Sequence, residues 1–338
     1  MTVIAPELPA EPVRDYFGRR AAAVDQGEAD VRDGLRFLAG LGLLGHPELR
    51  VSFELIRVVA RSCLASAFSI WAHTMVVDCL AAAASAAMVR LAGQLRGAAL
   101  VGSTAMAPAV KYMAGLGELP VHFRRDGEEL VLQGRIPWAS NLYDRNLVVV
   151  LSARDEAGGR VIVAVTGDDP ALELGRPARL LAMSGTASSD LRLDGVRVPP
   201  EAVISTDFPG YMKAMKPRLL VLQTAFCLGL ADASLDAASC LLDAAMERYR
   251  DDHAELAGRL RDLEARASRL VGALAPVPDA VETRLRAAQL AGDAVQLELR
   301  VAGGRGFTAD SPTARRYREA AFLPVQTPTE AQLQWELS

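Results

Sequence analysis

The sequence predicts an α+β fold in three parts: an N-terminal helical domain over residues 1–98, a middle antiparallel β-barrel or sandwich over residues 99–206, and a C-terminal helical bundle over residues 207–338. In the first and last parts, apolar residues recur at spacings of three and four, which is the period of an amphipathic helix. In the middle part, short apolar runs are separated by Gly, Asp and Pro turns, without helices between them. A chain of 338 residues is long enough for two or three such cores.

The first part shows helical periodicity over residues 13–94. Residues 64–87 are alanine-rich and apolar nearly all round, so this helix must be buried centrally or at a subunit contact. His73 lies in that run. It is either a hydrogen-bonded core residue or a general acid or base that faces a substrate cavity, since its ordinary pKa lies near neutrality.

The middle part is predicted to consist of short strands because β-branched and apolar residues cluster between turn residues. These strands are expected at residues 99–104, 121–123, 130–132, 147–152, 161–165, 172–174, 178–183 and 191–198. Their close succession favours a compact antiparallel barrel or sandwich.

One stretch of the middle part combines a strand, a turn and polar residues. Gly134 is expected to end one strand, and Trp138, Ser140 and Asn141 follow before the next strand begins. An indole can stack on a planar ligand while a hydroxyl and an amide supply hydrogen bonds. The alternative interpretation is a core tryptophan beside a polar turn.

The last part again has helical periodicity. Residues 219–242 form one long apolar helix in which Gly229 is a small packing residue, and residues 246–274 form an amphipathic, charge-laced helix. Prolines at 276 and 278 separate it from a further helix that runs to about residue 301.

Composition excludes several classes of protein. The net charge is -4 and arginines are interleaved with acidic residues, so no basic surface for nucleic acid is expected. The four cysteines are isolated, which argues against a disulfide framework or a zinc site, and no metal ligands are predicted. No signal-peptide pattern is present and no uncharged run approaches the ~20 residues of a membrane span, so a cytoplasmic location without membrane contact is expected.

Four segments occur in an order that one known family shares. They are Gly134-x-x-x-Trp138-x-Ser140-Asn141 before a hydrophobic strand, Met183-Ser184-Gly185-Thr186-Ala187-Ser188 with the strand that ends at Pro199, Gly303-Gly304-x-Gly306-Phe307, and Arg315-Arg316-Tyr317-Arg318-Glu319-Ala320 followed by Thr327-Pro328-Thr329-Glu330-x-Gln332. Together they resemble the acyl-CoA dehydrogenase family over roughly the last two-thirds of the chain.

The resemblance implies an FAD cofactor between the middle part and the C-terminal helices. Trp138 would lie against the flavin ring and Ser140 near its reactive nitrogen. The family's first cofactor motif, Thr-Glu-Pro followed by Gly-Ser-Asp, is absent, but the hydroxyls of Ser103 and Thr104 stand in its place and could donate to the flavin edge.

The resemblance also assigns cofactor contacts in the last part of the chain. Gly303 and Gly304 would let the backbone approach the dinucleotide, although a helix end followed by a loop uses the same residues. Arg300 replaces the family's glutamine, where a guanidinium could bind pyrophosphate or form a surface ion pair. Thr327 and Thr329 of the tail complete the implied contacts.

The family's catalytic glutamate is missing. Aligning Glu330 and Gln332 with the family's Glu and Gln places Gln326 at the position of the base. An amide cannot accept the proton that a base removes from the substrate α-carbon. The family's second base position falls in the first C-terminal helix, where neither Asp nor Glu lies between Gly210 and Gln223.

Three functions therefore remain open. The first in rank is a flavin-dependent oxidoreductase that oxidises the Cα–Cβ bond of an acyl thioester of CoA or a carrier protein. Gln326 stands at the family's base position, so another residue would have to be the base. His73 and Asp144 are the candidates. The second is a reduced-flavin-dependent monooxygenase, served by a flavin reductase. The third is a catalytically silent subunit of a hetero-oligomer. The apolar helices predict a homodimer or homotetramer, or such a hetero-oligomer.

Overall fold

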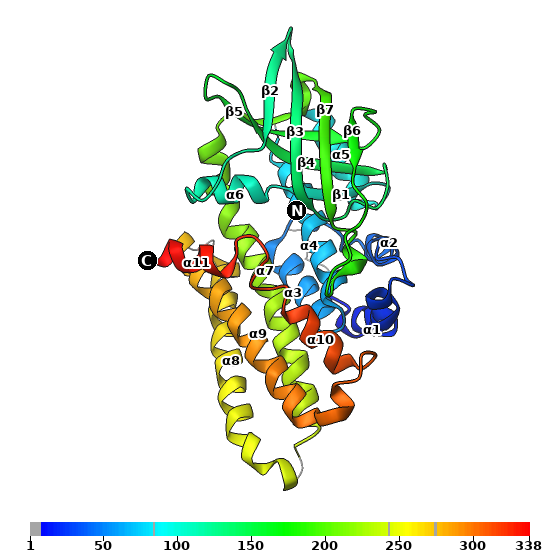
Figure 1. Cartoon of the computed structure of the whole chain (residues 1–338), viewed down its shortest axis with the longest axis vertical. Helices are drawn as coiled ribbons and strands as arrows, with labels where there is room; N and C mark the ends of the chain where they lie inside the picture. The colour runs from blue at the N-terminus through cyan, green and yellow to red at the C-terminus, as the bar shows by residue number, and fades with distance from the viewer. Residues whose placement is uncertain (1–7, 84, 243, 274–275) are drawn as a thin grey trace, which may run out of the picture.

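The computed structural model of the chain describes residues 8–83, 85–242, 244–273 and 276–338. Helices come first, strands follow, and helices return, so the predicted α+β class and the order of its parts are confirmed. In Figure 1 the sheet occupies the upper end of the molecule, and the long C-terminal helices extend to the lower end. The predicted domain limits fall just outside the first and last strands and stay a prediction.

In the described part of the chain five helices precede the sheet, and the fourth is almost entirely buried. They are α1 (Ala10–Gln26), α2 (Arg32–Gly40), α3 (Leu49–Ala60), α4 (Leu64–Ala81) and α5 (Ala86–Arg96). Nearly every residue of α4 is buried, as its lack of a polar face predicts. It packs against α3, α5, α7 and the first strand, so it connects the helical parts with the sheet.

The sheet contains eight strands in the order β6-β7-β3-β2-β4-β5-β8, with β1 paired to β4. The strands are β1 (Val101–Ala105), β2 (Val121–Asp126), β3 (Glu129–Ala139), β4 (Leu147–Arg154), β5 (Arg160–Thr166), β6 (Leu172–Leu174), β7 (Ser189–Val198) and β8 (Val203–Ser205). The expectation of a purely antiparallel sheet is wrong, because β1 and β4 pair in parallel. The connection through α6 (Ala107–Met113) and the β2–β3 hairpin returns the chain in the same direction.

The strand that carries Trp138 is longer than expected. Gly134 does not turn the chain but lies inside β3, which pairs with β7 as far as Ala139 with two register shifts. A Cβ at Gly134 would come within 2.4 Å of the Pro120 carbonyl oxygen, so the glycine permits a close approach of backbone. The strand expected at residues 178–183 does not form.

The C-terminal part is a bundle around one long helix. It comprises α7 (Phe208–Ser239), α8 (Arg250–Gly272), α9 (Val277–Gly306), α10 (Pro312–Ala320) and α11 (Glu330–Leu337). The helix α7 packs against α3 on one side and α9 on another. A Cβ at Gly229 would lie 2.3 Å from the Arg57 carbonyl oxygen, so this glycine allows α7 to approach α3 closely.

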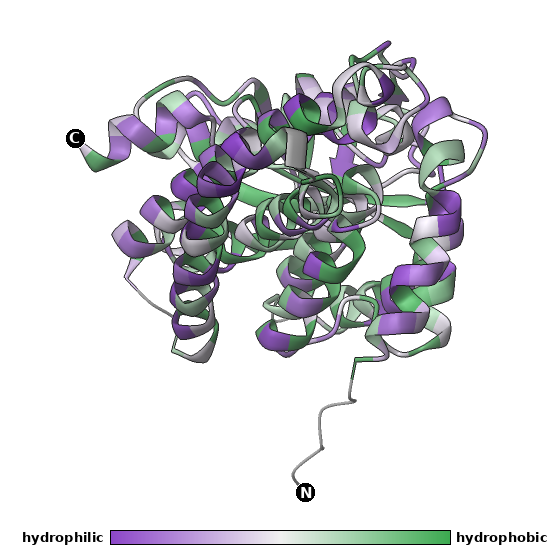
Figure 2. Cartoon of the chain, turned by 90° about the horizontal axis from the view of Figure 1, so that it is seen from below, coloured by the Kyte–Doolittle hydropathy of each residue, from purple (hydrophilic) through white to green (hydrophobic). Residues whose placement is uncertain are grey.

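Two helices, α4 and α7, are long and apolar enough to cross a membrane by length and composition alone, although a charged residue interrupts the apolar run of each. Within the fold, 89% of the apolar window of α4 and 83% of that of α7 are buried. Figure 2 shows hydrophilic residues along the outer sides of the surrounding helices and hydrophobic residues toward the centre. Both helices therefore serve as the core of this fold.

Candidate active site

A cavity of about 820 Å³ lies between the sheet and the helical parts. Its walls come from α4, the start of α6, the end of β3, the loop before β7, the helix α7 and the segment between α10 and α11. Five of the sequence-predicted residues line it: Thr104, Trp138, Ser140, Gln326 and Thr327. Its volume is in the range of about 300–1,000 Å³ that is usual for small-molecule sites.

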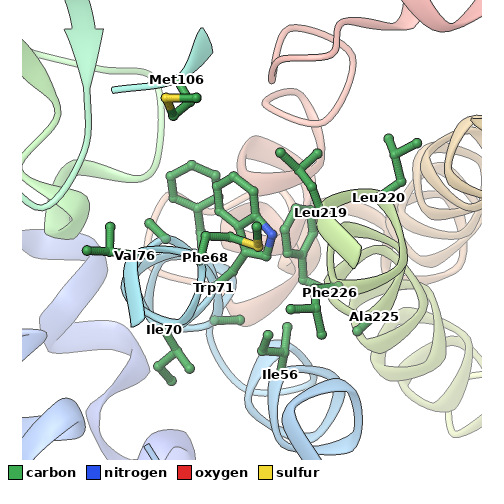
Figure 3. Packing of buried hydrophobic residues seen from close by; sticks show 14 of the residues in the cluster. Ile56, Phe68, Ile70, Trp71, Val76, Met106, Leu219, Leu220, Ala225 and Phe226 are labelled. Atoms are coloured by element: carbon green, nitrogen blue, oxygen red, sulfur yellow. The ribbon is translucent and has the colours of Figure 1, made fainter. Parts of the chain in front are cut away.

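The helical side of the cavity is aromatic. Phe68 and Trp71 of α4 lie 5.2 Å apart between ring centroids, and Phe322 meets Phe68 edge-on at 5.0 Å. Phe226 of α7 packs behind them, 6.3 Å from Trp71 (Figure 3). The indole Nε1 of Trp71 is buried without a hydrogen-bond partner among the described residues. Because an indole nitrogen only donates, it would suit an acceptor on a ligand.

The sheet side of the cavity joins two segments that are distant in the sequence. The Ser140 hydroxyl lies 2.8 Å from that of Ser188, and Ser188 lies 2.7 Å from the hydroxyl of Thr186. Trp138, at the end of β3, keeps 56% of its surface exposed on the same wall. An exposed indole beside a chain of hydroxyls provides a stacking surface and polar contacts for a planar ligand.

Ser103 and Asn141 support this wall but do not line the cavity. The buried Ser103 donates to the Ser140 carbonyl oxygen at 2.6 Å. The amide of Asn141 donates to the carbonyl oxygens of Ser69 and Gly102 at 3.0 and 2.9 Å. These bonds hold the end of β3 against α4 and β1. The implied role of Ser103 as a cofactor contact therefore becomes, in this structure, the positioning of Ser140.

Gln326 lies where α10 and α11 are joined, buried at the inner end of the cavity. Its Oε1 accepts a hydrogen bond of 2.9 Å from Nη2 of Arg284, while its Nε2 has no partner among the described residues. Arg284 is fully buried and also donates to Gln223 and to the Leu323 carbonyl oxygen, each at 3.2 Å. In this lining residue the amide therefore keeps a buried donor without a partner among the described residues.

The structure places Thr327 and Thr329 differently. Thr327 lines the cavity, and its carbonyl oxygen accepts a 3.0 Å hydrogen bond from Gln223. Thr329 is the N-cap of α11, where its hydroxyl accepts from the Gln332 amide at 3.2 Å. Its hydroxyl therefore caps the N-terminus of α11.

Arg300, Gly303 and Gly304 do not line the cavity. All three are exposed at the C-terminal end of α9, where Gly303 has a φ of 57° and interrupts the helix. Nothing lies within 4 Å of a Cβ at either glycine, so the backbone there is open. Within one chain, the structure does not bring these residues together with Trp138.

His73 is a core residue in this structure. It is fully buried, its Nδ1 accepts from the Gly102 amide at 3.1 Å, and its Nε2 lies 3.0 Å from the Leu95 carbonyl oxygen. Burial lowers the pKa of the imidazole to about 4, so it is neutral at pH 7. It does not line the cavity, and neither does Asp144, which pairs with Arg32. Neither candidate base is placed where it could reach a ligand there.

The sequence analysis missed Arg284 and Trp71. Arg284 belongs to the apolar stripe of α9 formed by Ala280, Leu285 and Ala288 with Ala291, so a charge in an inward-facing stripe was the available signal. For Trp71, the sequence shows a buried helix but not which of its residues face a cavity.

The chain was compared with known proteins. No family model matches it. It is 24% identical over 222 residues to the mitochondrial short-chain specific acyl-CoA dehydrogenase of Homo sapiens, which covers 60% of this chain and 53% of that protein. Its structure matches a glutaryl-coenzyme A dehydrogenase in complex with glutaryl-CoA, with a TM-score of 0.88 and 17% identity over 100% of this chain and 95% of the other. The chain is thus similar in sequence to an acyl-CoA dehydrogenase and shares the fold of these enzymes.

The similarity of fold extends over the whole chain. A prolyl acyl carrier protein oxidase matches with a TM-score of 0.85 and 15% identity, over 98% of each chain. The chain spans about half the length of the curated relatives it matches. The acyl-CoA dehydrogenase fold thus accounts for the order of helices, sheet and helices.

Proposed function

We propose that the chain is an FAD-dependent oxidoreductase that removes hydrogen from the Cα–Cβ bond of an acyl thioester of CoA or of a carrier protein. The observation that carries this proposal is the cavity itself. It brings the Trp138 and Ser140 wall and the Gln326 segment, two of the motifs that resemble the family, to one ligand-sized space in a fold shared with acyl-CoA dehydrogenases.

The residues of the cavity fit a flavin. A flavin ring has two apolar faces and a polar edge, and this wall combines the exposed Trp138 indole with the hydroxyls of Thr104, Ser140 and Ser188. We infer that Trp138, Thr104, Ser140 and Thr327 hold the ring. When bound, FAD would accept the hydride from the substrate β-carbon. Arg300, Gly303, Gly304 and Thr329 stay predicted cofactor contacts.

None of the described residues that line this cavity is a buried carboxylate that could accept the proton. Among its described lining residues the one carboxylate is Glu118, whose side chain is 73% exposed and lies 2.6 Å from Arg154. Gln326 holds the substrate and excludes water at the inner end rather than accepting a proton. We infer that the Glu118 carboxylate accepts the α-proton, while the hydride passes to the flavin.

The same observation favours a second candidate function. A monooxygenase that uses externally reduced flavin needs no carboxylate over the substrate α-carbon. An amide at position 326 is therefore compatible with that activity. A silent subunit of a hetero-oligomer is the remaining alternative.

The test is anaerobic reduction of the FAD-loaded chain. If the proposal holds, butyryl-CoA or a butyryl carrier protein bleaches the flavin absorbance near 450 nm without any reductase. Bleaching only by a flavin reductase with NADH would favour the monooxygenase, and loss of bleaching in Glu118→Gln would identify the route of the proton.

The wider setting is also part of the proposal. Exposed apolar side chains such as Phe307, which is 78% exposed, and Trp335, at 62%, support a homodimer or homotetramer. The electron acceptor and the cytoplasmic location stay predictions.

A further inference from the structure

Two buried donors of the cavity lining have no hydrogen-bond partner in the part of the chain that the structure describes. Nε2 of Gln326 and Nε1 of Trp71 are buried and lack hydrogen-bond partners among the described residues, and both side chains line the cavity. In Figure 3 the indole nitrogen lies on the side of Leu219, which is another lining residue. Buried donors are almost always paired in native proteins, so two in the lining of one cavity point to an acceptor on a ligand.

Behind these donors lies a positive charge without an acidic partner. Arg284 is fully buried, its three hydrogen-bond acceptors are all neutral, and its Nη1 has none. No carboxylate of the described residues forms an ion pair with it, whereas the half-buried Arg316 lies 2.8 Å from the fully buried Glu298. Burying an unpaired charge costs much free energy, so a negative group bound nearby would offset that cost.

The guanidinium also fixes the orientation of the Gln326 amide. A guanidinium has donors only, so the amide must turn its oxygen toward Arg284 and its NH₂ group away from it. The positive charge polarises the amide further and strengthens Nε2 as a donor. Gln326 is therefore oriented as a hydrogen-bond donor and not as a proton acceptor.

We propose that the inner end of the cavity binds a carboxylate of the ligand, and that the substrate acyl group carries this carboxylate in addition to its thioester. Gln326 Nε2 and Trp71 Nε1 donate to its oxygens, and Arg284 supplies the compensating charge through the Gln326 amide. That this ligand is the thioester substrate rests on the proposed function. The carboxylate site itself requires neither bound flavin nor a thioester.

The test compares two small probes of equal shape, hexanoate and hexanamide, by isothermal titration of the purified full chain at pH 7.5, as isolated and after saturation with FAD. Hexanoate is expected to bind about tenfold more tightly, the usual gain of a hydrogen bond to a charged group. Gln326→Met keeps the shape but removes the donor, and we expect it to reduce the preference to less than about threefold.

Two further variants separate the donors from the general charge of the cavity. Trp71→Phe keeps the aromatic packing, removes Nε1 and is expected to reduce the preference, which decides the question even if Gln326→Met does not fold. Lys111→Gln removes a positive charge from the lining outside this inner end and is expected to keep the preference. Thermal unfolding shows which variants are folded.

Equal binding of both probes, binding of neither, or a preference that disappears only in Lys111→Gln would overturn the carboxylate site. A clear hexanoate preference in a chain that takes up no FAD would leave this inference standing while the proposed function fails. Thioester oxidation by a chain that does not prefer hexanoate would support the proposed function and overturn the carboxylate site.

Discussion

The guanidinium of Arg284 donates to the side-chain oxygen of Gln326 at 2.9 Å, and both residues are buried. This bond orients the residue at the family's base position as a hydrogen-bond donor in the lining of the cavity. It also means that a carboxylate placed there would meet a cation directly.

Gln326→Glu is therefore expected to stabilise the fold rather than create a free base. The new carboxylate would pair with the unneutralised Arg284 and gain roughly 1–3 kcal/mol in the free energy of unfolding. Urea denaturation at pH 7 measures this gain. Gln94→Glu, which adds the same charge at an exposed position, is the matched control and should change stability by less than about 0.5 kcal/mol. A destabilised Gln326→Glu would show that Arg284 is not short of a counter-charge.

His73 should make stability depend on pH. Its pKa is 6.5 in the unfolded chain and about 4 in the fold, so the unfolded state binds an extra proton between these values. Its contribution to stability is complete above pH 6.5 and is lost as the pH falls toward 4, by roughly 3 kcal/mol in all.

The buried Glu319 acts in the opposite sense, because burial raises the pKa of its carboxyl to about 7. The difference in stability between the wild type and His73→Gln, measured at several pH values, isolates the histidine. Gln retains a donor and an acceptor but does not titrate. A difference that does not vary between pH 4 and 6.5 would contradict a neutral, buried His73.

Gly229 should be required for packing between α7 and α3. Gly229→Ala places a methyl group against the Arg57 carbonyl oxygen and the Ala60 side chain, and overpacking of this kind costs about 1–3 kcal/mol. Gly292→Ala in α9 has open space around its Cβ and is expected to be neutral or to stabilise by up to about 1 kcal/mol. The change in melting temperature of each variant, relative to the wild type, measures the two effects. Equal effects would mean that α7 and α3 are not in close contact.

Trp138 should contribute to cofactor binding. Replacing it with Ala removes the exposed ring from the cavity wall, and loss of one stacking partner is expected to weaken FAD binding by about tenfold. Trp335→Ala removes an equally exposed tryptophan that does not line the cavity and should leave the affinity unchanged. Fluorescence titration with FAD measures both. An unchanged affinity in Trp138→Ala would contradict the flavin position that we propose.

Much of the fold could be predicted from local patterns. The apolar run of α4 identified a central helix because a helix without a polar face has to be buried. The parallel pairing of β1 with β4 could not be predicted, because periodicity defines a strand but not its partner. Gly134 was taken for a turn because the sequence does not show that backbone from another segment approaches it.

The candidate site could be predicted only in part, because local patterns identify residues but not their long-range contacts. The motif around Trp138 indicated polar residues near a ligand, but the Ser140–Ser188 bond depends on the pairing of β3 with β7, which the sequence does not show. The charge of Arg284 and the donor role of Gln326 arise only from packing between α9 and the segment before α11. No local pattern contains that contact.

The most direct test of the central claim is the visible spectrum of the purified full chain, with the cofactor released and quantified. The account predicts a yellow protein that holds close to one FAD per chain, either as isolated or after incubation with FAD and gel filtration. A colourless protein that takes up no FAD would contradict it.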